Sequence, residues 1–143
     1  MLSALIVMDD PLLAGLVEYK LQKHGFTVYK ADDGQDALEL LSAERFDVLL
    51  LDVMIPKLDG YFVMQELKKP ALNSPRVIIV LSARSGEDDI LRAFELGAVD
   101  YITKPFSLNV LVERINIALK HKVDVGTAEA TAGSATHRPS YNC

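Results

Sequence analysis

The chain has 143 residues, of which half are hydrophobic and about a quarter are charged, and its formal net charge is −5. A chain of this size and composition can bury a core without a disulfide or a metal, and with one cysteine, Cys143, it has no intrachain disulfide. The acidic balance, with no cluster of Lys and Arg, argues against direct nucleic-acid binding. The apolar run at residues 2–8 is too short for a signal peptide or a membrane span, so we expect a cytoplasmic protein.

Short apolar segments alternate along the chain with segments of helical period. Strands are expected over residues 5–8, 26–29, 46–52, 77–81 and 99–103. Helices are expected over residues 11–24, from Asp33 through residue 41, and over residues 61–69, 88–96 and 108–120. Because the strands are continuously apolar, both faces of the sheet should be covered, which predicts an α/β doubly wound parallel sheet.

The composition of the chain changes at Val123. Residues 123–143 are mostly small and polar, and show no periodicity. This pattern is typical of a linker or tail, and it lacks the strands and helices of a DNA-binding domain. We therefore predict one domain over residues 1–122 and a flexible tail or linker over residues 123–143.

Polar and charged residues stand where the predicted strands end. Asp9 and Asp10 follow the first strand, Asp52 ends the third, and Ser82 and Lys104 follow the fourth and fifth. Each has an ordinary structural role when taken alone; Asp10, for example, is a good helix cap. In a parallel sheet, however, ligands bind beyond the carboxyl ends of the strands, so the joint placement predicts a common site.

The predicted site suits a divalent cation and a phosphoryl group. Three carboxylates held together repel one another unless a cation lies among them, and Mg²⁺ prefers such oxygen ligands. One carboxylate can then act as a nucleophile toward phosphorus, while Lys104 and the Ser82 hydroxyl neutralise and position the transferred group.

Four segments, LIVMDDP, LLLDVMIPKLDG, VIIVLSAR and LGAVDYITKPF, occur in the order and spacing of a known family. With them, the chain resembles the receiver domains of bacterial two-component response regulators, most closely the OmpR-like ones, over residues 2–120. The resemblance implies a (βα)5, CheY-like sheet with strand order 2-1-3-4-5. It also implies a signalling switch rather than a turnover enzyme, phosphorylated by a sensor histidine kinase or a phosphotransfer protein.

The resemblance assigns roles to residues at the strand ends. It implies that Asp52 is the phosphoacceptor and that Asp9, Asp52 and the Met54 carbonyl bind Mg²⁺. Ser82 and Lys104 are expected to contact the phosphoryl group. Two further implied features are an aromatic switch at Tyr101 and a cis bond between Lys104 and Pro105.

The same resemblance implies a contact face on the fourth helix, fifth strand and fifth helix, through which OmpR-like receivers form homodimers. By motif position, Asp100 and Arg114 match one charge pair of that face. Ile90 and Val110 stand where another charge pair is usual, which predicts a more hydrophobic contact.

The first strand departs from the family pattern. Receivers usually have two adjacent acids at its end, but counting back from the first helix gives Asp9 the second place and leaves Met8 in the first. A register shifted by one residue would make Asp9 and Asp10 the pair, although nothing in the first helix favours that shift. We still expect Mg²⁺ binding, with Asp10 as a candidate replacement for the missing carboxylate.

Three other functions stay open. Met8 favours a pseudo-receiver, which would act as a phosphorylation-independent interaction module. A phosphatase with an aspartate nucleophile fits less well, because the acids at the first strand's end are adjacent rather than one residue apart. A flavodoxin-like cofactor site fits poorly, because the acidic MDDP loop would repel a phosphate.

Overall fold

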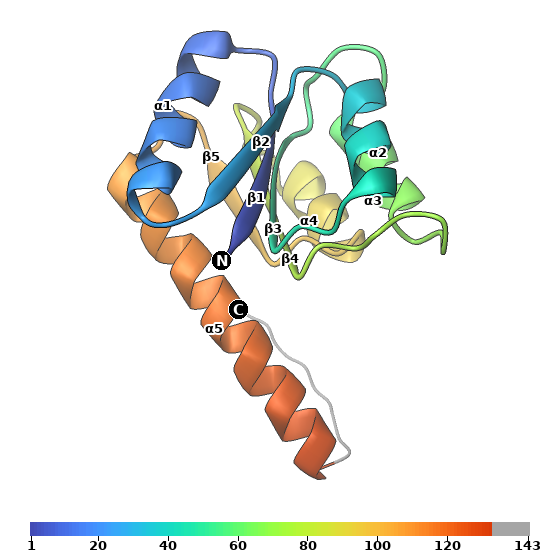
Figure 1. The fold of residues 1–143 in the computed structure, drawn as a ribbon. Coiled ribbons are helices and arrows are strands. Elements are labelled where there is room, and N and C mark those ends of the chain that lie inside the picture. The colour runs from blue at the N-terminus through green and yellow to red at the C-terminus, as the bar shows by residue number, and fades with distance from the viewer. Residues whose placement is uncertain (133–143) are drawn as a thin grey trace.

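The computed structural model describes residues 1–132, and for residues 122–132 it describes the backbone only. Strands and helices alternate along the whole of this range (Figure 1). They are β1 (Ser3–Val7), α1 (Pro11–Lys23), β2 (Thr27–Ala31), α2 (Gly34–Ala43), β3 (Val48–Asp52), α3 (Gly60–Glu66), β4 (Val77–Ser82), α4 (Glu87–Glu95), β5 (Asp100–Thr103) and α5 (Leu108–Ala132).

The five strands form one parallel sheet in the order β2-β1-β3-β4-β5. The doubly wound α/β fold and its strand order are therefore as predicted. Helices α1 and α5 cover one face, and α2, α3 and α4 cover the other (Figure 1).

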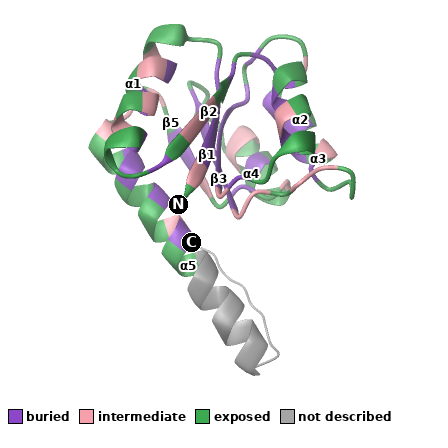
Figure 2. Ribbon diagram, in the orientation of Figure 1, coloured by how far each residue is buried: buried purple, intermediate pink, exposed green. Residues whose placement is uncertain are grey.

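Both faces of the central strands β1, β3 and β4 are buried, which explains why these strands are continuously apolar. All five residues of β3 are buried (Figure 2). Alternate residues of β1 belong to the cores on opposite faces of the sheet. Leu5 and Val7 join the core beneath α2, α3 and α4, whereas Ile6 and Met8 join the core beneath α1 and α5.

Three of the five helices begin at an aspartate that caps them. Asp10 accepts hydrogen bonds from two amides of α1, and Asp33 and Asp59 each accept one from α2 and α3. Such caps satisfy amides that have no partner within the helix. Helix α4 differs, because it begins after Gly86 and has no side-chain cap.

The end of α5 differs from the predicted one. The helix reaches Ala132, although the sequence predicts an end at residue 120 and no regular structure from residue 123. Buried Leu111, Ile115 and Leu119 already anchor the helix, and each further residue adds a backbone hydrogen bond in a segment rich in alanine. The proposed boundary at residue 122 stays a prediction, and residues 133–143 of the predicted tail lie outside the described residues.

Other boundaries shift by a few residues. Strand β2 extends to Ala31, α3 ends at Glu66, and β4 includes Ser82 as its last residue. Within the described residues, no helix is long and apolar enough to cross a membrane.

Candidate functional site

The strand register brings the predicted site residues to one edge of the sheet. Val7 of β1 pairs with Leu51 of β3, so the next residue of each strand, Met8 and Asp52, lies at the same level. Asp52 pairs in turn with Leu81 of β4. The carboxyl ends of these strands therefore meet where the sequence predicts a site.

Asp52 is a buried carboxylate with a cationic partner. It is 3% exposed, and its Oδ2 lies 2.5 Å from Nζ of Lys104, which follows β5. Its Oδ1 accepts a hydrogen bond from the Met54 amide at 2.9 Å. Both oxygens thus have a partner, and the ammonium group compensates the charge that burial would otherwise destabilise.

Ser82 lies beside this pair but bonds elsewhere. Its side chain is fully buried, and Oγ accepts a hydrogen bond from the Arg84 amide at 3.1 Å. Its carbonyl accepts one from the Lys104 amide at 2.8 Å, which ties the ends of β4 and β5 together. Among the described residues, the Ser82 hydroxyl has no hydrogen bond to Asp52 or to Lys104.

The end of β1 offers one exposed carboxylate. Met8 is 2% exposed and packs into the core beneath α1 and α5, so its side chain does not contribute to the site. Asp9 is exposed. Asp10 caps α1, with Oδ1 accepting from the amides of Leu12 and Leu13 at 3.1 and 3.2 Å. To bind a cation in place of the missing carboxylate, Asp10 would have to give up its hydrogen bonds to both of these amides.

The residues at this edge include donor types that suit a hard divalent cation, but among the residues that the structure describes, Asp9, Asp10 and Asp52 do not form a group with carboxylate oxygens within 4.8 Å of one another. Two carboxylates, Asp9 and Asp52, and the Met54 carbonyl are the donor types that Mg²⁺ prefers, and Mg²⁺ usually keeps several waters. A cation there would compete with Lys104 for Asp52. Of the three residues that follow β1, Met8 is buried and apolar, Asp10 caps α1, and Asp9 is exposed and makes no hydrogen bond through its side chain among the described residues.

A second acidic group, which the sequence pattern did not single out, lies at the start of α2. Carboxylate oxygens of Asp32, Asp33 and Asp36 come within 4.8 Å of one another. The Asp36 amide and the nearby Lys57 ammonium lower the pKa of Asp33, and the charge of Asp33 raises the pKa of Asp36. The Asp33–Lys57 ion pair, at 3.2 Å, gives this group a structural role at the α2 start.

The predicted switch residue faces inward. Tyr101 of β5 is 8% exposed, and its hydroxyl donates to the Arg84 carbonyl at 3.0 Å. It thus bonds the same residue whose amide contacts Ser82. The bond between Lys104 and Pro105 is cis, as predicted.

The predicted contact face has both polar and apolar parts. Asp100 and Arg114 form an ion pair at 3.2 Å within one chain. Val110 is 46% exposed, but Ile90 is partly buried against the core and offers only part of its side chain to a partner. Other exposed apolar side chains on these helices are Leu91, Phe94 and Ile117.

A doubly wound sheet in this strand order, with Asp, Ser and Lys at the carboxyl ends of its strands, defines the class of CheY-like signalling domains. The family model of the response regulator receiver domain matches residues 4–116, and the chain belongs to this family.

Solved receiver domains resemble the chain along most of its length. The receiver domain of the Francisella response regulator 1452 is 33% identical, with a TM-score of 0.77, and the match covers 85% of this chain and 98% of that one. The signal receiver domain of a histidine kinase from Syntrophus aciditrophicus is 31% identical, with a TM-score of 0.73 and coverages of 85% and 92%. The beryllofluoride-activated receiver domain of Klebsiella pneumoniae RstA is 30% identical, with a TM-score of 0.74 and coverages of 82% and 97%.

Proposed function

We propose that this receiver domain is a phosphoacceptor switch in which Asp52 accepts a phosphoryl group from a sensor histidine kinase or a phosphotransfer protein. The observation that carries the proposal is the buried Asp52 carboxylate at the end of β3, paired with Lys104 at 2.5 Å. The proposed donor is a phosphohistidine. An Asp52 oxygen attacks phosphorus, the P–N bond breaks, and the leaving imidazole takes a proton from solvent.

Lys104 and Ser82 are proposed to stabilise the transferred group. Lys104 can move its ion pair from the Asp52 carboxylate to a phosphoryl oxygen, so that the buried negative charge stays compensated. Ser82 has to release the Arg84 amide before its hydroxyl can donate to another phosphoryl oxygen. Mg²⁺, held by Asp9, Asp52 and the Met54 carbonyl, would neutralise charge that develops on the phosphoryl group.

The proposed output is a change of partner at the α4–β5–α5 face. Release of Arg84 by Ser82 would alter the segment that Tyr101 holds, and this segment leads directly into α4. Self-association through the face that contains Ile90, Asp100, Val110 and Arg114 is therefore expected to strengthen on phosphorylation. The domain would assist its own phosphorylation and dephosphorylation without turning over a separate substrate.

Phosphorylation by acetyl phosphate with Mg²⁺ tests the assignment of Asp52. Intact-mass measurement should show one added phosphoryl group on the wild-type protein and none on Asp52→Asn. Asp88→Asn is the matched control, because it removes an exposed carboxylate from α4 and should be labelled like the wild type. Equal labelling of Asp52→Asn would show that another residue accepts the group.

A pseudo-receiver is the second candidate function, and the buried Met8 is the observation that favours it. In that case, the fold would present its surfaces without a metal or a phosphoryl group. Absence of labelling in the wild-type protein, together with absence of Mg²⁺ binding by calorimetry, would support this candidate over the phosphoacceptor.

A further inference from the structure

Tyr61 links the first turn of α3 to the first turn of α4. Its side chain is 4% exposed, and its hydroxyl donates to the Asp89 carbonyl at 3.1 Å. Burial raises the pKa of Tyr61 to about 12, so the hydroxyl keeps its proton and stays a donor well into the alkaline range. The guanidinium of Arg92 lies 4.2 Å from the centre of the same ring.

The start of α4 depends on contacts from outside the helix. Its first amides have no side-chain cap, because Gly86 stands where the other capped helices have an aspartate. A glycine supplies no side-chain acceptor for these amides, but it is only slightly less stabilising than serine at this position, and Glu87, Asp88 and Asp89 favour the turn through the helix dipole. The Tyr61 hydroxyl bond and an Arg84–Asp89 ion pair at 3.6 Å fix the position of this turn relative to α3 and to the end of β4.

The segment of residues 83–89 is held from two sides. From β5, the Tyr101 hydroxyl bonds the Arg84 carbonyl at 3.0 Å, and from α3, the Tyr61 hydroxyl bonds the Asp89 carbonyl. This segment directly follows Ser82 and leads into α4. The two tyrosine bonds therefore lie on the path along the chain from Ser82 to the first turn of α4.

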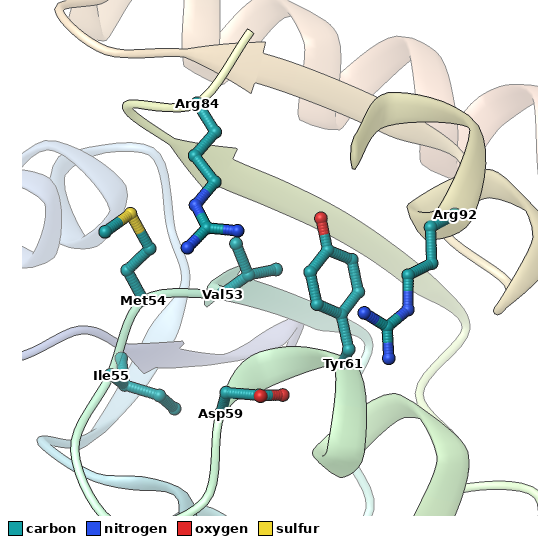
Figure 3. Close-up of a pocket in the computed structure, with 7 residues that line it drawn as sticks. All are labelled: Val53, Met54, Ile55, Asp59, Tyr61, Arg84 and Arg92. Carbon is teal, nitrogen blue, oxygen red and sulfur yellow. The ribbon is translucent and has the colours of Figure 1, made fainter. Parts of the chain in front are cut away.

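A cavity of about 220 Å³ lies beside this segment. Figure 3 shows the Tyr61 ring between the side chains of Arg84 and Arg92, with Met54 on the side of Arg84 and Asp59 at the start of α3. Arg84 lines this cavity together with the buried side chains of Val53 and Tyr61, so there is open space next to the Arg84 side chain.

We propose that Tyr61 is a second positioning residue for the switch, acting from α3 as Tyr101 acts from β5. Its hydroxyl bond holds the first turn of α4 in the resting position, and the turn moves on phosphorylation only when this bond breaks. The inference rests on the proposed function, because it assigns the bond a role in the response to a phosphoryl group on Asp52.

Tyr61→Phe tests the bond alone, because it removes the hydroxyl and keeps the ring beneath Arg92. Tyr19→Phe is a matched control: Tyr19 is 62% exposed, has a lysine ammonium 5.4 Å from its ring centre, and its hydroxyl has no hydrogen bond among the described residues. Amide hydrogen exchange of the full unphosphorylated chain should be about two- to tenfold faster at residues 86–92 in Tyr61→Phe. Exchange in β1 and β3, and throughout Tyr19→Phe, should match the wild type.

Gly86→Ser tests the same idea in the opposite direction and does not alter Tyr61. A side chain at Gly86 would meet an Asp89 carboxylate oxygen at 3.5 Å, an ordinary contact, and a serine there can cap α4. Exchange at residues 86–92 should then be slower than in the wild type. This variant keeps the inference testable where Tyr61→Phe does not fold.

The rate of phosphorylation by acetyl phosphate distinguishes a role of Tyr61 in the switch from a purely structural role in holding the first turn of α4. Tyr61→Phe should be phosphorylated faster than the wild type, and Gly86→Ser more slowly. Unchanged exchange at residues 86–92 in Tyr61→Phe would overturn the inference, and so would faster exchange with an unchanged phosphorylation rate. If the wild-type protein takes no phosphoryl group, the proposed function fails, and exchange alone decides whether Tyr61 holds α4.

Discussion

Replacing Met8 with aspartate should make the stability of the domain depend strongly on Mg²⁺. Met8 is 2% exposed and packs beneath α1 and α5, so the substitution removes about 1.5–3 kcal/mol of side-chain burial. It also adds a carboxylate to an edge that already holds Asp9 and Asp52. Without Mg²⁺, we expect the free energy of unfolding to fall by roughly 2–4 kcal/mol, a large part of the 5–15 kcal/mol that is typical of a domain.

The same carboxylate should strengthen the binding of Mg²⁺. A tenfold lower Kd corresponds to about 1.4 kcal/mol, and a ligand at 100 times its Kd stabilises the folded state by about 2.7 kcal/mol. Mg²⁺ should therefore restore much of the stability that Met8→Asp loses, and it should stabilise the wild-type protein less.

Urea denaturation with excess Mg²⁺ or with EDTA measures both effects. Met8→Leu is the matched control, since it keeps the apolar volume and should cost less than about 1.5 kcal/mol under both conditions. The reasoning is refuted if Mg²⁺ stabilises Met8→Asp no more than it stabilises the wild type. That result would place the new carboxylate away from the cation, or show that Asp10 already serves as the additional ligand.

Three further predictions concern residues around the site. Asp10→Ala should lower the free energy of unfolding by about 1 kcal/mol, because it removes the α1 cap, whereas Asp10→Asn should keep the cap. Weaker Mg²⁺ binding by Asp10→Asn in calorimetry would identify Asp10 as a ligand. Val110→Glu should weaken a dimer of the beryllofluoride-activated protein in sedimentation more than Asp100→Ala does, because an exposed ion pair contributes about 1 kcal/mol or less; the reverse order would make the charge pair dominant. The pKa of Asp33 is lowered in the folded protein, so the ionised carboxylate stabilises the fold at pH values above its ordinary pKa of 3.8. This stabilisation is lost as the pH falls through the lower pKa of the folded state. When the free energy of unfolding is measured against pH in acid, Asp33→Asn should therefore lose less stability over that range than the wild type.

The sheet was predictable because its strands are short and separated by helical segments, and because its central strands are almost entirely apolar. The run of residues 48–51 has no polar position, which requires cover on both faces and excludes a half-exposed antiparallel strand. The end of α5 was not predictable in the same way. Composition suggests a linker from residue 123, yet a helix already anchored by buried residues continues through alanine-rich sequence.

The position of the site was predictable because the carboxyl ends of parallel strands lie at one edge. The side-chain contacts within the site were not predictable, because they depend on the directions in which the side chains point. The sequence alone cannot show that Ser82 bonds Arg84 rather than Asp52, or that Tyr61 reaches a carbonyl 28 positions along the chain. Ile90 shows the same limit, because its motif position suggests an outward side chain, whereas the structure partly buries it.

Met8 affects the balance between the cation-free and the cation-bound site, and the direction of the effect follows from charge alone. Without a cation, Asp52 is already neutralised by Lys104, and Met8 adds no further negative charge, so the resting edge contains little repulsion to relieve. With a cation, the site offers one carboxylate fewer than a receiver with an acid at this position. If Asp9, Asp52 and the Met54 carbonyl hold Mg²⁺ as proposed, both effects favour the cation-free state. Phosphorylation of this receiver should therefore need more Mg²⁺ than phosphorylation of Met8→Asp, even though Asp52, Ser82 and Lys104 are the same in both.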